Sequence, residues 1–92
     1  MQIERDDARQ RYVASDDGTP AGELTFEVEE GTIRLLHTGV APDAEGQGVG
    51  SDLARRALDD ARRDGVRVDP RCEFVAGFID RNPEYAGLVQ DR

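Results

Sequence analysis

The strongest constraint on the fold is a glycine-rich turn between an apolar strand-like segment and an amphipathic helix. The turn is Gly46-Gln47-Gly48-Val49-Gly50-Ser51, and it follows the apolar segment 32–40. After it, apolar residues recur at helical spacing to about Asp64. These residues are Val49, Leu53, Ala54, Ala57, Leu58 and Ala61. Backbone N–H groups and the positive end of the helix dipole therefore meet at the turn, which predicts an anion-binding site.

The turn itself admits several interpretations. A P-loop needs a Lys after its glycines, and the chain contains no Lys. A dinucleotide-binding turn stays open, because Gly46 and Gly48 fit its first two glycines and Asp69 could hold a ribose. Its third position would be Ser51, where Gly or Ala is expected. A plain strand-to-helix connection needs one glycine rather than three, so we favour an anion-binding site.

Hydrophobic patterning over the rest of the chain predicts an α/β (α+β) fold with a mixed sheet of about four strands. Strands are expected at 11–15, 23–29, 32–40 and 66–68, and Phe74, Val75, Phe78 and Ile79 indicate a second helix that ends at Asn82-Pro83. Segment 32–40 is apolar on both faces, with His37 on the face of Ile33 and Leu35, so we expect a central strand. Segments 32–40 and 66–68 should pair in parallel through the helix between them.

Composition limits the possible partners. The 92 residues allow one domain, 1–92, and the net charge of −8 argues against nucleic acid. All 12 basic residues are Arg, which suggests an acidic, salt-adapted (halophilic) protein; a charge field that attracts a cationic amine is the alternative. With one cysteine there is no internal disulfide. No apolar run or leader-like N-terminus is present, so we expect a cytoplasmic protein without a membrane partner.

Segment 41–53, which contains the glycine-rich turn, resembles motif A of the GNAT N-acetyltransferases, Q/R-x-x-G-x-G/A. From about Gly18 onward, with His37-Thr38, Cys72 and Pro83-Glu84-Tyr85, the chain is similar to the minimal single-domain (YjdJ-type) GNAT subfamily. The resemblance implies a minimal acyl-CoA N-acyltransferase fold with a central and a C-terminal helix. It also implies transfer of an acetyl group from acetyl-CoA to an amine, without a metal.

The resemblance further implies where acetyl-CoA binds. The strands at 32–40 and 66–68 would splay apart to admit the pantetheine arm, and the pyrophosphate would meet backbone N–H groups of the turn. Glu45 departs from the motif, which begins with Arg or Gln, and a carboxylate there opposes the pyrophosphate charge. The implied cofactor-binding residues are Thr38, Gly39, Val40, Glu45, Gly46, Gln47, Gly48, Val49, Gly50 and Ser51.

Acetyl transfer to an amine needs a base, donors for the oxyanion and an acid for the departing thiolate. His37 is the only histidine and the candidate base, unless it is bonded within the sheet. Cys72 follows the strand at 66–68, so it should lie at the sheet edge that holds the turn. It could contact the thioester, carry the acetyl group or simply pack. Tyr85 is the candidate acid by analogy with larger GNAT enzymes, or an anchor for the last turn.

Direct transfer is the expected mechanism, and two other functions stay open. A CoA-binding module without catalysis is one, since the chain has no length for the N-terminal helices that shape the acceptor pocket in larger GNAT enzymes. A nicotinamide-binding fragment is the other. The amine acceptor is not identified by the sequence, and an exposed sheet edge would allow a homodimer.

Overall fold

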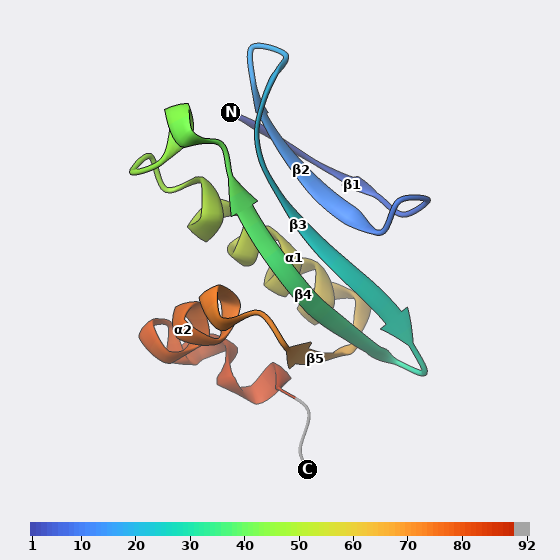
Figure 1. The fold of residues 1–92 in the computed structure, drawn as a ribbon. Coiled ribbons are helices and arrows are strands. Elements are labelled where there is room, and N and C mark those ends of the chain that lie inside the picture. Colours follow the sequence, from blue (N-terminus) through green and yellow to red (C-terminus); the bar gives the residue numbers. More distant parts are fainter. Residues whose placement is uncertain (90–92) are drawn as a thin grey trace.

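The structure, a computed structural model, describes residues 1–89 and has one sheet with helices packed on it (Figure 1). The strands lie in chain order, and β1 to β4 form an antiparallel meander that β5 joins in parallel to β4. The strands are β1 (Gln2–Asp6), β2 (Arg11–Asp16), β3 (Thr19–Glu29), β4 (Thr32–Val40) and β5 (Arg67–Pro70). The helices are α1 (Val49–Asp64), α2 (Glu73–Arg81) and the 3-10 segments η1 (Pro42–Ala44) and η2 (Pro83–Leu88).

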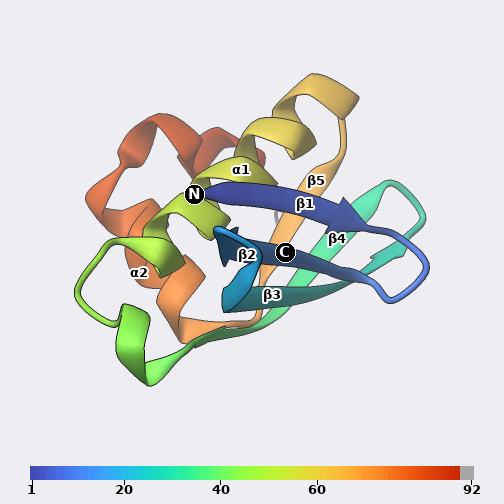
Figure 2. The same ribbon diagram turned by 90° about the horizontal axis from the view of Figure 1, so that it is seen from above.

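Helix α1 agrees with its predicted stripe. All six residues of the stripe are buried, and Gly65 ends the helix in a left-handed conformation with φ of 71°. Helix α2 contributes Val75, Phe78 and Ile79 to the same hydrophobic cluster as α1 and the inward face of the sheet. The helices therefore cover one face of the sheet and leave the other face without a helix (Figure 2).

The sheet has five strands rather than about four, because β1 was not predicted. Within β1 the inward positions are Ile3, opposite Ala14, and Arg5, opposite Tyr12. The Arg5 guanidinium lies 5.5 Å from the ring centre of Tyr12 and 5.0 Å from that of Phe26. A cation stacked on aromatic rings thus occupies a position where alternation would require an apolar residue, which hides the strand from a hydrophobicity pattern.

A β-bulge in the β3–β4 pair changes which residues of β4 face the core. Phe26 lies opposite Leu35, but Leu24 lies opposite Thr38, so β4 has one residue more than β3 between these pairs. The extra residue reverses the alternation. Leu35 and Thr38 therefore share the inward face, and His37 lies opposite Thr25 on the outer face, where it is exposed. The expectation that His37 shares a face with Ile33 and Leu35 is wrong for this reason.

A buried ionic cluster joins α1 to the first two strands. Asp60, which is 3% exposed, accepts hydrogen bonds from the Tyr12 hydroxyl at 2.8 Å and from Arg56 Nε at 3.1 Å. Arg56 also donates to the carbonyl of Ile3 at 3.0 Å. Burial, and then the bond to Asp60, raise the pKa of Tyr12 well above its usual range, so this hydroxyl stays a donor. None of the helices within residues 1–89 is long and apolar enough to cross a membrane.

This cluster predicts a large stability effect at Asp60. Replacing Asp60 with Ala leaves the buried Tyr12 hydroxyl and the half-buried Arg56 without their acceptor, so we expect a loss of about 3 kcal/mol in the free energy of unfolding. Urea denaturation would measure it. The control is Asp64→Ala in the same helix, whose side chain is 42% exposed and which should change stability by less than about 0.5 kcal/mol. Equal effects of the two substitutions would contradict the role of the cluster.

Candidate functional site

A cavity of about 410 Å³ lies where the end of β4 meets the beginning of α1. Its walls come from β4, η1, the glycine-rich turn, α1 and α2. They are formed by Thr38, Val40, Ala44, Glu45, Gly46, Gly48, Val49, Gly50, Ser51 and Phe74. Most of the residues expected to bind the cofactor thus surround one space; Gly39 and Gln47 do not line it.

The glycine-rich turn presents the N-terminus of α1 to this cavity. Gly46 and Gly48 have φ of 84° and 80°, in the left-handed region, and a Cβ on either would meet nothing within 4 Å. Their backbone conformation, rather than a lack of space, is what requires glycine. The first turn of α1 begins with a bond from the Asp52 N–H to the Gly48 carbonyl, and Gly48 has no side chain that could cap the helix. The N–H groups of Gly48 to Ser51 are therefore donors for an anion, whereas the N–H of Gln47 already donates to the carbonyl of Ala44 at 3.3 Å.

Phe74 forms the wall opposite these donors. A Cβ on Gly50 would lie 2.8 Å from Cζ of the Phe74 ring, so the ring rests directly on the first turn of α1. Phe74 is 40% exposed and lies outside the hydrophobic core, although it shares the helical apolar spacing of Val75, Phe78 and Ile79. It lies in the first turn of α2, before the buried residues Val75 and Phe78, and faces the cavity instead.

The strands β4 and β5 stay paired only over their first residues. Their register runs from Thr32 and Arg67 to Leu35 and Pro70, and the N–H of Cys72 then donates to the carbonyl of Leu35 at 2.9 Å. Within residues 1–89, β4 has no strand beside it on that edge from Leu36 to Val40. Apart from the N–H of Thr38, which is bonded to the Cys72 sulfur, the backbone groups of this edge are available to an extended ligand, as a splayed pair of strands requires.

Cys72 and Thr38 meet at this edge. Cys72 is the N-cap of α2 and is 8% exposed, and its Sγ lies 3.3 Å from Oγ1 of Thr38. Burial by itself raises the pKa of the Cys72 thiol, but hydrogen bonds from the Thr38 hydroxyl and from backbone N–H groups of Val75, Phe74 and Thr38 outweigh it and leave the pKa below its usual value. The position gives Cys72 more thiolate character than an ordinary buried cysteine.

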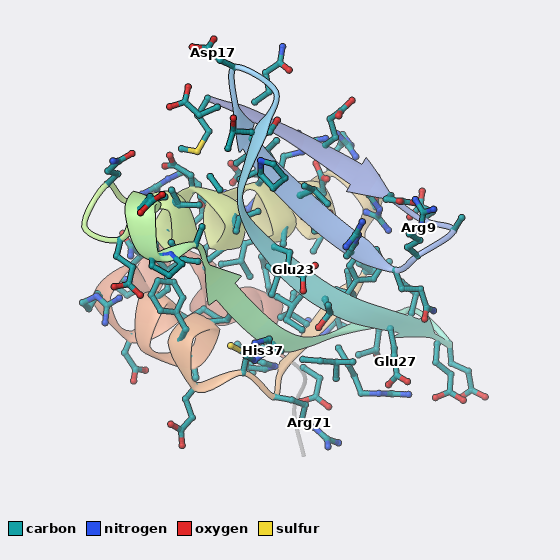
Figure 3. The ribbon with its side chains drawn as sticks, turned by 45° about the horizontal axis from the view of Figure 1, so that its top comes forward. Arg9, Asp17, Glu23, Glu27, His37 and Arg71 are labelled. Atoms are coloured by element: carbon teal, nitrogen blue, oxygen red, sulfur yellow. The ribbon has the colours of Figure 1, made fainter. Side chains whose placement is uncertain are left out.

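None of the three candidate catalytic residues lines the cavity: Cys72 contacts its wall at Thr38, and His37 and Tyr85 lie elsewhere. His37 projects from the outer face of β4, and its Nε2 lies 3.5 Å from where a Cβ of Gly39 would stand (Figure 3). Tyr85 is 4% exposed and donates from its hydroxyl to Oδ1 of Asp59, in the middle of α1, at 2.7 Å. Burial and this bond raise the pKa of Tyr85. Its surroundings are those of an anchor for η2.

The side chains that line the cavity have a net negative charge. Glu45 is the one charged side chain among the lining residues, and it is exposed. Three of the four arginines that could have reached a phosphate have other partners: Arg56 is bonded to Asp60, Arg71 to Asp69 at 2.8 Å, and Arg55 lies over the ring of Phe78 at 5.2 Å. The fourth, Arg81, does not line the cavity. Any anion bound in the cavity would therefore depend on backbone N–H groups.

The sequence pattern of a known family, the GCN5-related N-acetyl-transferases, matches residues 11–88. The solution structure of a GCN5-like protein from Staphylococcus aureus is similar to this one with a TM-score of 0.74 and 22% identity, over 99% of this chain and 89% of that chain. No curated protein sequence matches the chain.

Two crystal structures are similar over a smaller part. The ribosomal-protein-S18-alanine N-acetyltransferase of Escherichia coli has a TM-score of 0.61 and 24% identity, over 63% of this chain and 38% of that chain. A GNAT family acetyltransferase from Brucella melitensis, in complex with acetyl-CoA, has a TM-score of 0.55 and 32% identity, over 62% of this chain and 41% of that chain. The chain thus spans less than half the length of these two enzymes.

The contact between Thr38 and Cys72 predicts how the thiol titrates. Thr38→Val keeps the shape of the side chain and removes the hydroxyl, so the pKa of Cys72 should rise toward its ordinary value. The rate of alkylation by iodoacetamide follows the thiolate fraction of Cys72. The pH at which this rate is half of its maximum should therefore be higher in the variant. Thr25→Val, on the outer face of β3, is the matched control and should leave the midpoint in place. An unchanged midpoint in Thr38→Val would show that the hydroxyl does not stabilise the thiolate.

Proposed function

Because the chain belongs to the GCN5-related N-acetyltransferase family, we propose that it binds acetyl-CoA in the cavity at the N-terminus of α1 and transfers the acetyl group to an amine. The observation that carries the proposal is that the N-terminus of α1 and the unpaired edge of β4 adjoin each other at one cavity. The cavity that receives the helix N-terminus also contains Thr38, which contacts Cys72 beside the unpaired edge of β4. An anion site and a strand edge that can hold an extended arm thus adjoin each other.

Acetyl-CoA would be held by two kinds of backbone contact. The N–H groups of Gly46 and of Gly48 to Ser51 would bind the pyrophosphate, and the edge from Leu36 to Val40 would bond the amides of the pantetheine arm. Such contacts need no metal and no basic side chain. One family member of known structure is in complex with acetyl-CoA, which supports the same donor here.

In the proposed reaction the amine nitrogen attacks the thioester carbonyl carbon. The C–S bond breaks, CoA leaves as a thiolate, and the nitrogen gives its proton to a base. His37 is the proposed base, since its imidazole is exposed on the outer face next to the free edge of β4. A backbone N–H of this edge would stabilise the oxyanion. Tyr85 has no place in the proposal, because its hydroxyl is bonded to Asp59.

An acetyl-Cys72 intermediate is the second candidate route, and the lowered pKa of the Cys72 thiol favours it. In this route Sγ attacks the thioester and CoA leaves, and the amine then attacks the acetyl-cysteine. Intact mass after incubation with acetyl-CoA separates the routes. A protein heavier by one acetyl group, with no such change in Cys72→Ala, would support the intermediate. Amine acetylation by Cys72→Ala at an unchanged rate would support direct transfer.

The proposed function is tested by binding and by turnover. We expect calorimetric titration at high salt to show binding of CoA and acetyl-CoA and none of NAD, and a screen of primary amines to show CoA release. Absence of CoA binding would contradict the site itself. Binding without acetylation of any amine would favour a CoA-binding module without catalysis, and binding of NAD alone would favour the nicotinamide interpretation.

Glu45 offers a second test of where the pyrophosphate lies. Glu45→Arg replaces a repulsive charge at the cavity by an attractive one, so CoA should bind about tenfold more tightly at low salt and the gain should shrink as salt rises. Glu30→Arg makes the same charge change at the β3–β4 turn, at the far end of β4, and is the matched control. Equal affinities for both variants at low salt would place the pyrophosphate elsewhere.

A further inference from the structure

A second cavity, of about 380 Å³, opens on the outer face of the sheet, which no helix within residues 1–89 covers. Its walls come from β2, β3 and the end of β4, and they include Arg11, Val13, Pro20, Glu23, Gly39 and Val40. Bulges in the β2–β3 and β3–β4 pairs bend the sheet around it. The cavity is therefore a hollow formed by the sheet itself.

This outer cavity adjoins the cavity proposed for acetyl-CoA. Val40 lines both, and the edge of β4 between them has no neighbouring strand within residues 1–89. His37, on the same outer face, lies over Gly39 in the wall of the outer cavity. A group in the outer cavity can thus approach a thioester past the free edge of β4, with His37 beside it.

A third hollow, of about 410 Å³, continues from the outer cavity at Pro20 and Ala41, which line both. Asp16, Asp17 and Asp43 give it three carboxylates, and Met1 with its terminal ammonium also lines it. No basic side chain of residues 1–89 lines it. None of these aspartates forms a salt bridge with another described residue.

The outer cavity differs from the third hollow in charge. Its two charged side chains, Arg11 and Glu23, form an ion pair at 3.0 Å and offset each other. The joined hollows therefore have a neutral end beside His37 and an anionic end at the β2–β3 turn. Between these ends lie the apolar residues Val13, Pro20 and Ala41.

We propose that these joined hollows bind the amine acceptor, and that the acceptor is an aliphatic diamine or polyamine. The reacting amino group lies next to His37, in a neutral environment that does not favour its ammonium form. Methylene groups pass Pro20, and a second ammonium lies among the three aspartates. The reaction is the one given above: nitrogen bonds to the acetyl carbon, the C–S bond breaks, and His37 receives the proton. The inference rests on the proposed function and names its substrate class.

The test compares two acceptors that differ only in the second charge. Diaminobutane and butylamine are supplied to the full chain with acetyl-CoA, and KM is measured for each. The variant Asp16→Asn/Asp17→Asn should raise KM for diaminobutane about three- to tenfold, leave kcat in place and leave butylamine unaffected. Asn suits this turn, since residue 17 has φ of 49° and precedes Gly18. Glu30→Gln, at the other end of the sheet, is the matched control and should change nothing (Figure 1).

Two results would overturn the inference. If both amines are acetylated with similar KM, or if the double variant leaves KM for diaminobutane unchanged, the acceptor carries no second cation while the acetyltransferase function stands. If acetyl-CoA binds and no amine is acetylated, the proposed function fails. Calorimetric titration of the protein with diaminobutane alone then tests whether the joined hollows bind a polyamine. If diaminobutane binds, and binds more weakly to the double variant, the result would support the acidic hollow as a polyamine site. Absence of binding would contradict it.

Discussion

The site depends on how closely the first turn of α1 packs on the sheet. At Gly22 of β3, an added Cβ would lie 2.8 Å from the Gly39 carbonyl oxygen and 3.0 Å from Cγ1 of Val49. Only a residue without a side chain lets β3, β4 and α1 approach this far. This packing fixes the helix N-terminus beside the end of β4, and the ring of Phe74 closes against Gly50. The donors of the turn thus face a cavity rather than open solvent.

Much of the fold could be predicted because the buried residues of several segments follow an uninterrupted helical or strand-like spacing. Helix α1 has a complete stripe, and β4 has the bounds expected of it. The failures share a cause, which is that a local pattern carries no information on tertiary partners. In β1, Arg5 is held by aromatic rings from other strands. In β4, one additional residue at the bulge moves His37 to the opposite face, and alternation counted along one strand does not detect a register shift against its neighbour.

The candidate site was predictable to a similar extent. The order of strand, glycines and helix placed the turn correctly, and it put Cys72 at the same end of the sheet. The contact of Cys72 with Thr38 and the exposure of Phe74 depend on how α2 packs, which no spacing in the sequence specifies. Membership in the acetyltransferase family is shown, whereas the minimal subfamily, the salt adaptation and the roles of individual residues stay predictions.

The agreement between strand order and chain order has a consequence for folding. Strands β1 to β4 pair with their neighbours through short turns, so their contacts are local and form with little loss of chain entropy. Pairing of β5 with β4 is different, because it must close a loop that contains all of α1. That closure also carries Cys72 and Phe74 to β4 and α1, so the cavity forms only when this slowest contact is made. A molecule that has its hairpins but not this contact would contain most of the sheet and would lack the cavity proposed for acetyl-CoA.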